Sequence, residues 1–165
     1  MSAAKRALFI DWGGTLARTR DNRTVVDAAG HPELMPNVAA TLRRERPRYD
    51  LCFIVSNQAR IAKGEISDAE VVRRFAWANE QLGGPFTGWR LCPHSDSDAC
   101  GCRKPRPGMF LELARRHGVA LSASTHVGDS EKDRDAAAAA GVGRFVWARD
   151  FFAWADEPGR DPAGN

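Results

Sequence analysis

The sequence has no hydrophobic run close to the roughly 20 residues that a membrane-spanning helix needs. Its first residues, MSAAKRALFIDW, contain a basic pair, but the apolar stretch that follows is too short for a signal peptide. The chain also has no large charge excess, and a formal net charge of +3 does not indicate a nucleic-acid-binding protein. We therefore expect a cytoplasmic protein that acts on a small molecule and contacts neither membranes nor nucleic acids.

Cysteine is scarce, and in a reducing compartment the four cysteines are expected to be thiols or metal ligands instead of disulfides. A hydrophobic share of 43% and a charged share of 27% are typical of a globular chain. The length of 165 residues fits one domain and permits a monomer. We expect this domain to cover residues 1–156, and residues 157–165 to form a disordered tail.

Short apolar runs alternate with helical patterns along the whole chain. The runs expected to be buried parallel strands are residues 6–10, 50–56, 88–92, 124–128 and 143–148. The helices expected between them cover residues 37–46, 67–83, 107–118 and 130–140. This alternation predicts a doubly wound, Rossmann-like α/β sheet, in which ligands bind at the carboxyl ends of the strands.

Polar residues stand at those strand ends. Asp11 follows the first strand, Ser56 ends the second, and Asp129 follows the fourth, with Asp133 four residues later. Lys104 lies in the loop RKPRPG, just before a helix. Each residue alone could be a cap, a turn residue or a surface charge. Together they are the groups that phosphoryl transfer through an aspartyl phosphate requires, with Mg²⁺ between carboxylates and phosphate.

The order of these residues resembles the haloacid dehalogenase (HAD) superfamily over about residues 6–148. The first motif of that family, DxDGT, is DWGGT here, and its second is represented by Ser56. Its third motif is Lys104, and its fourth, GDxxxD, is GDSEKD. The resemblance implies that Asp11 is the nucleophile.

The same resemblance implies a magnesium site. Its ligands would be Asp11, the backbone carbonyl of Gly13 and Asp129. Asp133 would join this metal site and orient either the lysine or a metal-bound water.

The segment CPHSDSDACGC presents Cys92, His94, Cys100 and Cys102 within eleven residues. Three thiolates and an imidazole suit tetrahedral zinc in a closed, structural site. Reduced cysteines without metal, or a disulfide, are the alternatives. Cys52 lies inside an apolar strand and is expected to be an inert core thiol.

The pattern CPH…CxCRKPxPG resembles the histidinol-phosphatase-like HAD branch, and most of all its D-glycero-D-manno-heptose-1,7-bisphosphate 7-phosphatases. VSNQARIAKG is similar to that group's VTNQSGIARG, and LMPNVAATLRR to its LLPGVAEAL. Members of the group lack a large cap domain, and a zinc loop and short flaps shape their pocket instead. We expect Asn57, Lys63 and Arg103 to bind the substrate, with a plain surface arginine as the alternative for Arg103.

Gly13 departs from the family. HAD phosphatases carry an aspartate there, which protonates the leaving alcohol and then activates water, a contribution of roughly 10²–10⁴-fold. Three explanations are open. The substrate has a leaving group that needs little protonation, such as an anomeric phosphate; Glu131, Asp133 or His31 replaces the aspartate; or the protein binds phosphate esters or a partner without efficient turnover.

The first motif is also similar to the DWAGT of phosphonoacetaldehyde hydrolase, but no segment here is long enough for that family's helical cap. His117 and His126 are expected to be structural, and Trp12 to line the pocket or pack beneath it. The predicted function is a magnesium-dependent phosphatase for a small phosphorylated metabolite, such as a sugar phosphate or bisphosphate. A phosphate-ester-binding protein with impaired catalysis is the alternative.

Overall fold

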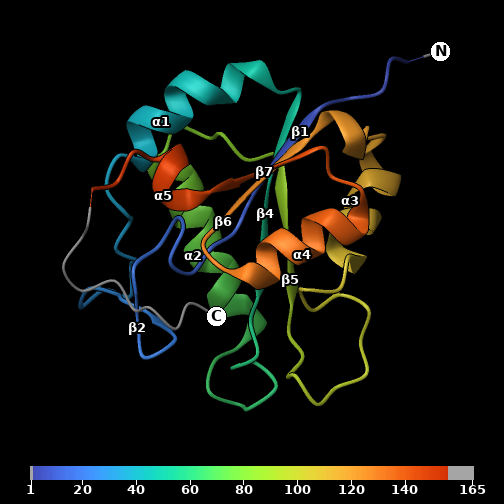
Figure 1. Ribbon diagram of the computed structural model, residues 1–165. Coiled ribbons are helices and arrows are strands. Elements are labelled where there is room, and N and C mark those ends of the chain that lie inside the picture. The colour runs from blue at the N-terminus through green and yellow to red at the C-terminus, as the bar shows by residue number, and fades with distance from the viewer. Residues whose placement is uncertain (1, 156–165) are drawn as a thin grey trace.

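The computed structural model describes residues 2–155, and the predicted tail over 157–165 lies outside them. A five-stranded parallel sheet forms the centre, in the order β5–β4–β1–β6–β7 (Figure 1). Its strands are β1 (Ala7–Ile10), β4 (Leu51–Asn57), β5 (Gly88–Cys92), β6 (Thr125–Gly128) and β7 (Arg144–Trp147). The five predicted strands are confirmed, each end shifted by one residue at most.

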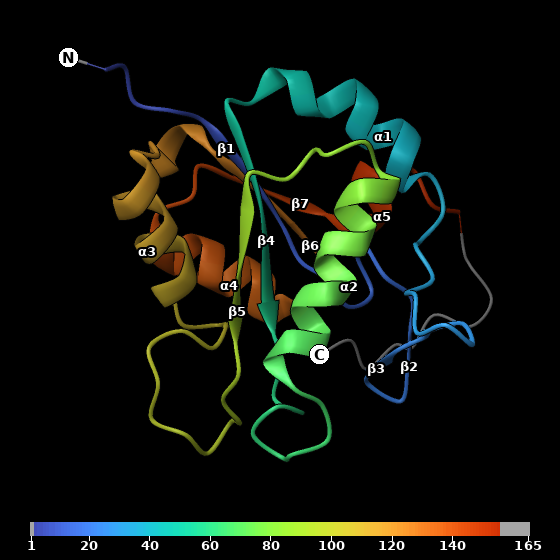
Figure 2. The same ribbon diagram turned by 180° about the vertical axis from the view of Figure 1, so that it is seen from behind.

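Helices cover both faces of the sheet (Figures 1 and 2). On one face lie α1 (Val38–Glu45), α2 (Asp68–Gln81) and α5 (Ala148–Phe151). On the other lie α3 (Gly108–His117) and α4 (Glu131–Ala140). The four predicted helices are confirmed, while α5 is too short to show a helical period in the sequence. Short 3₁₀ turns occur at Arg46–Arg48 and Leu121–Ala123.

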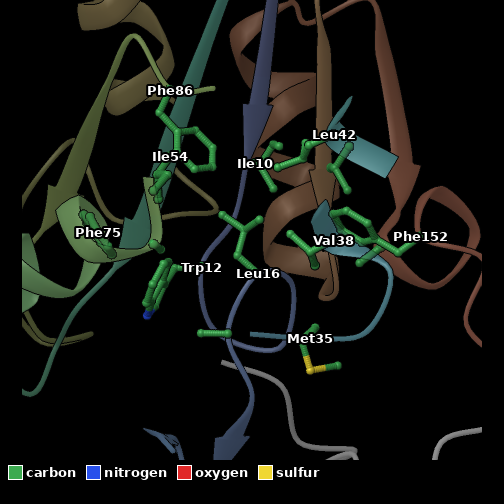
Figure 3. Close-up of a cluster of buried hydrophobic side chains, with 14 of the residues drawn as sticks. Ile10, Trp12, Leu16, Met35, Val38, Leu42, Ile54, Phe75, Phe86 and Phe152 are labelled. Atoms are coloured by element: carbon green, nitrogen blue, oxygen red, sulfur yellow. The ribbon is translucent and has the colours of Figure 1, made fainter. Parts of the chain in front are cut away.

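The apolar residues of β1 divide between two hydrophobic clusters. Leu8 and Ile10 face the side of α1, α2 and α5, whereas Ala7 and Phe9 face the side of α3 and α4. All four side chains are fully buried. Burial on both faces explains why this strand is a continuous apolar run instead of an alternating one. Figure 3 shows part of the first cluster, with side chains such as Val38, Leu42, Phe75 and Phe152 around Ile10.

The chain runs from β1 outward through β4 to β5, and then returns to place β6 and β7 on the other side of β1. In such a sheet the carboxyl ends of the central strands meet at a topological switch point, where ligands bind. A two-stranded hairpin, β2 (Thr19–Arg20) and β3 (Arg23–Thr24), lies at this end, as do the loops over 58–66 and 93–107 (Figures 1 and 2). The hairpin is not predicted from the sequence.

Within residues 2–155 no large cap domain covers the sheet, as expected. None of the described helices combines the length and apolarity that crossing a membrane would require.

Candidate active site

Asp11 lies just past the end of β1, and its side chain is almost completely buried. The chain then turns at Gly14, whose φ is 72°. A Cβ atom on Gly14 would lie 2.2 Å from Oδ2 of Asp129, so this position has no room for any side chain. The second glycine of DWGGT is therefore required by the close approach of Asp129, a carboxylate more than 100 residues away in the sequence.

Asp129 and Asp133 lie at the junction between β6 and α4. Ser130 caps α4, and its hydroxyl accepts a hydrogen bond from the backbone N–H of Asp133 at 3.4 Å. In return, Oδ2 of Asp133 accepts from the N–H of Ser130 at 3.2 Å, which completes a capping box. A Cβ on Gly128 would lie 2.4 Å from Cβ of Asp133. This tight junction holds Asp133 beneath the end of the sheet, 1% exposed.

Lys104 connects the carboxylates. Its ammonium group donates to Oδ1 of Asp11 at 2.8 Å, to Oδ1 of Asp133 at 2.6 Å and to the carbonyl of Val55 at 2.9 Å. The side chain of Asn57 bonds both backbone polar groups of Lys104, accepting from its N–H at 2.9 Å and donating to its carbonyl at 3.0 Å. The lysine is thereby fixed at its backbone and at its charged end.

The three carboxylates form one group, with an oxygen of each within 4.8 Å of the others. Burial and then the charges of Asp11 and Asp133 raise the pKa of Asp129 to about 8. Burial and Asp133 also raise the pKa of Asp11, against the opposing effect of Lys104. Burial disfavours the ionised form of Asp133, but Lys104 and His126 outweigh it and hold its pKa well below the usual range.

These properties fit a divalent cation. The three carboxylates outnumber the single ammonium group among them, and Oδ1 of Asp129 is buried without a hydrogen-bond partner among the described residues. Buried polar atoms in native proteins are nearly always paired, so an unpaired carboxylate oxygen beside two other carboxylates indicates a missing ligand. Oxygen donors of this kind are those that Mg²⁺ prefers.

His126 belongs to this cluster too, which the sequence analysis did not predict. It is fully buried in β6, with Nε2 at 3.1 Å from Oδ1 of Asp133 and Nδ1 at 3.1 Å from the carbonyl of Phe9. The ring therefore packs behind Asp133 and helps to fix it. The only signal in the sequence is a polar residue within an apolar run, which does not identify its partner.

A second cluster lies at the end of β5 and in the loop that follows it. Sγ of Cys92 lies 3.8 Å from Sγ of Cys100, 3.0 Å from Sγ of Cys102 and 3.3 Å from Nδ1 of His94. A tetrahedron with metal–sulfur bonds of about 2.3 Å has edges of about 3.8 Å, which the distance between Cys92 and Cys100 matches, while the other two distances are shorter. The cysteines of the described chain are free, so the predicted alternative of a disulfide is wrong. This ligand set fits zinc.

A pocket of about 520 Å³ opens above the carboxylates. Asn57, Lys63 and Arg103, the predicted substrate-binding residues, all line it. Arg103 is only 7% exposed, and its Nε donates to Oδ1 of Asp96 at 2.7 Å. An ordinary surface arginine is therefore not the explanation for this residue.

The pocket wall also contains Gly13, Ser56 and Trp12. Ser56 is almost fully buried, and its hydroxyl accepts from Nε2 of Gln58 at 2.9 Å. Trp12 both lines the pocket and packs in the core, where its ring lies 4.8 Å from that of Phe75 (Figure 3).

The three residues considered as substitutes for an aspartate at position 13 do not line the described part of this pocket. His31 stacks on Trp77 with ring centroids 4.7 Å apart. Glu131 has a side chain that is 79% exposed. Asp133 lies buried below, with both carboxylate oxygens already hydrogen-bonded.

A doubly wound sheet with this cluster at its switch point defines an α/β phosphohydrolase. A family model, haloacid dehalogenase-like hydrolase, matches residues 6–141. The chain belongs to this family of hydrolases, and the resemblance found in the sequence is confirmed.

Within this family, the chain is similar to phosphatases of heptose bisphosphates. The chain is 34% identical over 155 residues to the D-glycero-beta-D-manno-heptose-1,7-bisphosphate 7-phosphatase of Rhodopseudomonas palustris, covering 87% of this chain and 84% of that protein. It is 33% identical over 118 residues to the D-glycero-alpha-D-manno-heptose-1,7-bisphosphate 7-phosphatase of Mycobacterium bovis, covering 67% and 62%.

The crystal structure of the D,D-heptose 1,7-bisphosphate phosphatase from B. bronchiseptica, complexed with magnesium and phosphate, has a similar fold. The TM-score is 0.76 at 28% identity, with 93% of this chain and 89% of that one covered.

Proposed function

We propose that this protein is a magnesium-dependent phosphatase that removes one phosphate from a sugar bisphosphate through an aspartyl phosphate on Asp11. The observation that carries the proposal is the contact of Lys104 with both Asp11 and Asp133 at the floor of the pocket. The three relatives described above are named as heptose-bisphosphate phosphatases, which supports the substrate class.

In this mechanism a carboxylate oxygen of Asp11 attacks phosphorus, and the sugar oxygen leaves on the opposite side. Lys104 favours the ionised form of Asp11 before the attack and then binds a phosphate oxygen, with the hydroxyl of Ser56 beside it. Mg²⁺, held by Asp11, Asp129 and the carbonyl of Gly13, would neutralise charge on the phosphate oxygens. We assign Asp133 to holding Lys104, because its oxygens are already bonded to Lys104, His126 and Ser130.

The leaving sugar oxygen receives no proton from residue 13, since Gly13 has no side chain. Asp96 is the other carboxylate among the described lining residues of the pocket besides Asp11. Its hydrogen bond to Arg103 holds the pKa of Asp96 below its usual value, so it is ionised at neutral pH and is a poor proton donor. We therefore propose that the favoured ester has a stable leaving group, such as an anomeric phosphate.

We also propose a structural zinc ion bound by Cys92, His94, Cys100 and Cys102. The segment between these ligands contributes Ser95, Asp96 and Ser97 to the pocket wall. The metal would thereby shape one side of the substrate site without taking part in the chemistry.

The lack of an acid–base group in the described pocket favours a second candidate, a protein that binds phosphate esters without efficient turnover. A panel of esters separates the two. Phosphate release would be measured with and without Mg²⁺ on both anomers of D-glycero-D-manno-heptose 1,7-bisphosphate, on the heptose 1- and 7-phosphates, and on simple alkyl and aryl phosphates.

Magnesium-dependent turnover that prefers a bisphosphate supports the phosphatase proposal, and the position of the remaining phosphate shows which ester is cleaved. Tight binding of these esters without release of phosphate would instead establish the second candidate.

A further inference from the structure

The pocket is much richer in positive charge than the transfer of one phosphate requires. Its described cationic lining residues are Arg60, Lys63, Arg74, Arg103, Lys104 and Lys132. At the floor, the charge of Lys104 is matched by Asp11 and Asp133. Arg103 and Lys132 both lie near Asp96, at 2.7 and 3.8 Å. The remaining three come from a different part of the wall, the loop after β4 and the α2 helix that follows it.

Arg74 is the unusual member of this group. Its side chain is only 16% exposed, and its Nε is buried without a hydrogen-bond partner among the described residues. Arg74 forms an ion pair with Glu70, but Oε1 of Glu70 lies 3.6 Å from Nε, which is beyond hydrogen-bonding distance. Glu70 is also hydrogen-bonded to Arg73, whose Nε lies 3.1 Å from its other oxygen.

Such an atom calls for an explanation, because a buried N–H donor without an acceptor destabilises the folded protein. Among the described side chains the only other polar atom in this condition is Oδ1 of Asp129, in the proposed magnesium site. An unpaired anionic oxygen there fits a cation, and an unpaired cationic donor at a pocket wall fits an anion in the same way. Guanidinium groups bind phosphate with paired, charge-assisted hydrogen bonds.

The position of Arg74 separates it from the reacting phosphate. Asp11 and Lys104 meet at the strand ends, whereas Arg74 lies on α2, directly before Phe75. The ring of Phe75 packs against Trp12 (Figure 3), and Nε1 of Trp12 donates to Oγ1 of Thr24 in the hairpin at 3.1 Å. No hydrogen bond or ion pair joins Arg74 to Asp11 or Lys104 in the described structure.

The neighbours of Arg74 along the wall support an anion there. Arg60 and Lys63 precede α2 and line the same pocket. Nε of Arg60 is bonded to Glu65 at 2.7 Å, and Glu65 also lies 3.8 Å from Arg23 of the hairpin. This acidic residue ties the loop to the hairpin at the pocket.

We infer that Arg74 is a specificity-determining residue that binds the second phosphate of the substrate, the one that is not transferred. The inference rests on the proposed phosphatase function and extends it from the reacting end of the pocket to α2. Arg60 and Lys63 add positive charge around that second phosphate.

The test measures binding, so that turnover is not required. The full-length chain with Asp11→Asn would be titrated, in the presence of Mg²⁺, with D-glycero-D-manno-heptose 1,7-bisphosphate and with each of the two monophosphates. Adding Arg74→Leu should weaken bisphosphate binding by about 10- to 100-fold, the range for losing a charge-assisted bond. The monophosphate that retains the transferred phosphate should bind within about twofold of its original affinity.

Arg73→Leu is the matched control. Arg73 is the preceding residue on α2 and shares Glu70, but its side chain is 69% exposed and does not line the pocket. This variant should leave both affinities unchanged. Arg74→Lys keeps the positive charge and loses the planar guanidinium group, so it should weaken bisphosphate binding by an intermediate factor. If the leucine variant does not fold, the lysine variant provides the test.

Equal weakening of bisphosphate and monophosphate binding would overturn the inference, because Arg74 would then act on the pocket as a whole. An unchanged ratio of the two affinities in both Arg74 variants would overturn it as well. If no ester is hydrolysed by the wild-type protein, the phosphatase proposal fails, whereas this binding ratio still decides the role of Arg74.

Discussion

The two candidate metal sites of this protein are built in opposite ways. The thiol cluster draws its four ligands from the end of β5 and the loop that follows it, within eleven residues of sequence. The carboxylate cluster draws Asp11 from the end of β1, and Asp129 and Asp133 from the junction between the neighbouring strand β6 and α4, more than 100 residues later. The thiol cluster depends mainly on the conformation of one loop at the end of a strand, whereas the carboxylate cluster exists only when the central strands of the sheet have paired.

The difference extends to their charges. The thiols of the zinc cluster lose their protons when the metal binds. Three of the four ligands in this cluster are partly exposed to solvent. The carboxylates are held together in the interior by Lys104, close to one another and partly against their own repulsion. Strongly shifted pKa values of this kind are concentrated at active sites. We expect the carboxylate cluster to govern the reaction and the thiol cluster to govern the shape of the pocket.

The largest effect is expected from Asp11→Asn. The amide is not a nucleophile and binds a cation weakly, so phosphate release should fall by about 10⁴-fold or more. Zinc content should not change, because the thiol cluster has no contact with this residue. Phosphate release and metal analysis on the same preparation check both parts.

Asp135→Asn is the control for Asp11→Asn, since Asp135 is an exposed carboxylate on α4. It should leave turnover unchanged. Wild-type turnover in the Asp11→Asn protein would show that the reaction does not pass through an aspartyl phosphate.

Gly13→Asp adds the carboxylate that HAD phosphatases carry at this position, and it tests whether the rest of the carboxylate site is competent for catalysis. Gly13 lines the open pocket. Its φ is not in the positive range that favours glycine, unlike the φ of Gly14. Turnover of alkyl phosphates should rise, up to roughly the 10²–10⁴-fold of a general acid–base group. Aryl phosphates should gain less, because their leaving groups need little protonation.

Gly13→Ala adds a Cβ without a carboxylate and separates steric from chemical effects. It should give no gain on any ester. A folded Gly13→Asp protein without a gain on any ester would show that other parts of the site have diverged, and would favour the binding protein over the phosphatase.

Cys100→Ser tests the other half of the comparison. Burial opposes ionisation, but the N–H groups of Arg103 and Cys102 and the neighbouring thiols together outweigh it and lower the pKa of Cys100 to about 6. As a thiolate at neutral pH it is a ready zinc ligand. The variant should fall from near one equivalent of zinc per chain to a small fraction of that, and its melting temperature should fall with it.

Cys52→Ala provides the contrast, because Cys52 is a fully buried thiol outside the loop. It should lose stability through its cavity and keep its zinc. Purified wild-type protein without zinc would contradict the structural-zinc proposal.

The smallest effect is a pH dependence of the carboxylate cluster. The folded protein raises the pKa of Asp129 from 3.8 to about 8, so the folded state binds a proton that the unfolded chain releases. The contribution of Asp129 to stability in magnesium-free buffer should therefore fall as pH rises from about 4 to about 8. Binding of Mg²⁺ displaces this proton, and its affinity should rise by at most about tenfold per pH unit over the same range.

Thermal unfolding at several pH values, with and without Mg²⁺, measures this dependence, and Asp129→Asn isolates it from the other acidic groups. The variant should show a flatter pH profile and little stabilisation by Mg²⁺. A wild-type profile in the variant would mean that another group takes up the proton.

The sequence determined the layout of the sheet and much of the site by local rules. Continuous apolar runs mark strands buried on both faces, and a polar residue after each run lies at the end where a parallel sheet binds ligands. The residues Asp11, Ser56, Lys104, Asp129 and Asp133 were therefore predicted as one site, and the structure brings them together. The thiol cluster was predictable because its ligands are close in sequence.

Only the tertiary structure decided which partners these residues have. Asn57 holds the backbone of Lys104, and His126 packs behind Asp133, although neither pairing has a sequence pattern. Arg74 lies on a helix whose period places it at the edge of the buried face, and no local rule shows that this edge borders the pocket. Such contacts join residues that are far apart in the chain. They depend on how helices and strands pack, which hydrophobic periodicity and capping motifs do not specify.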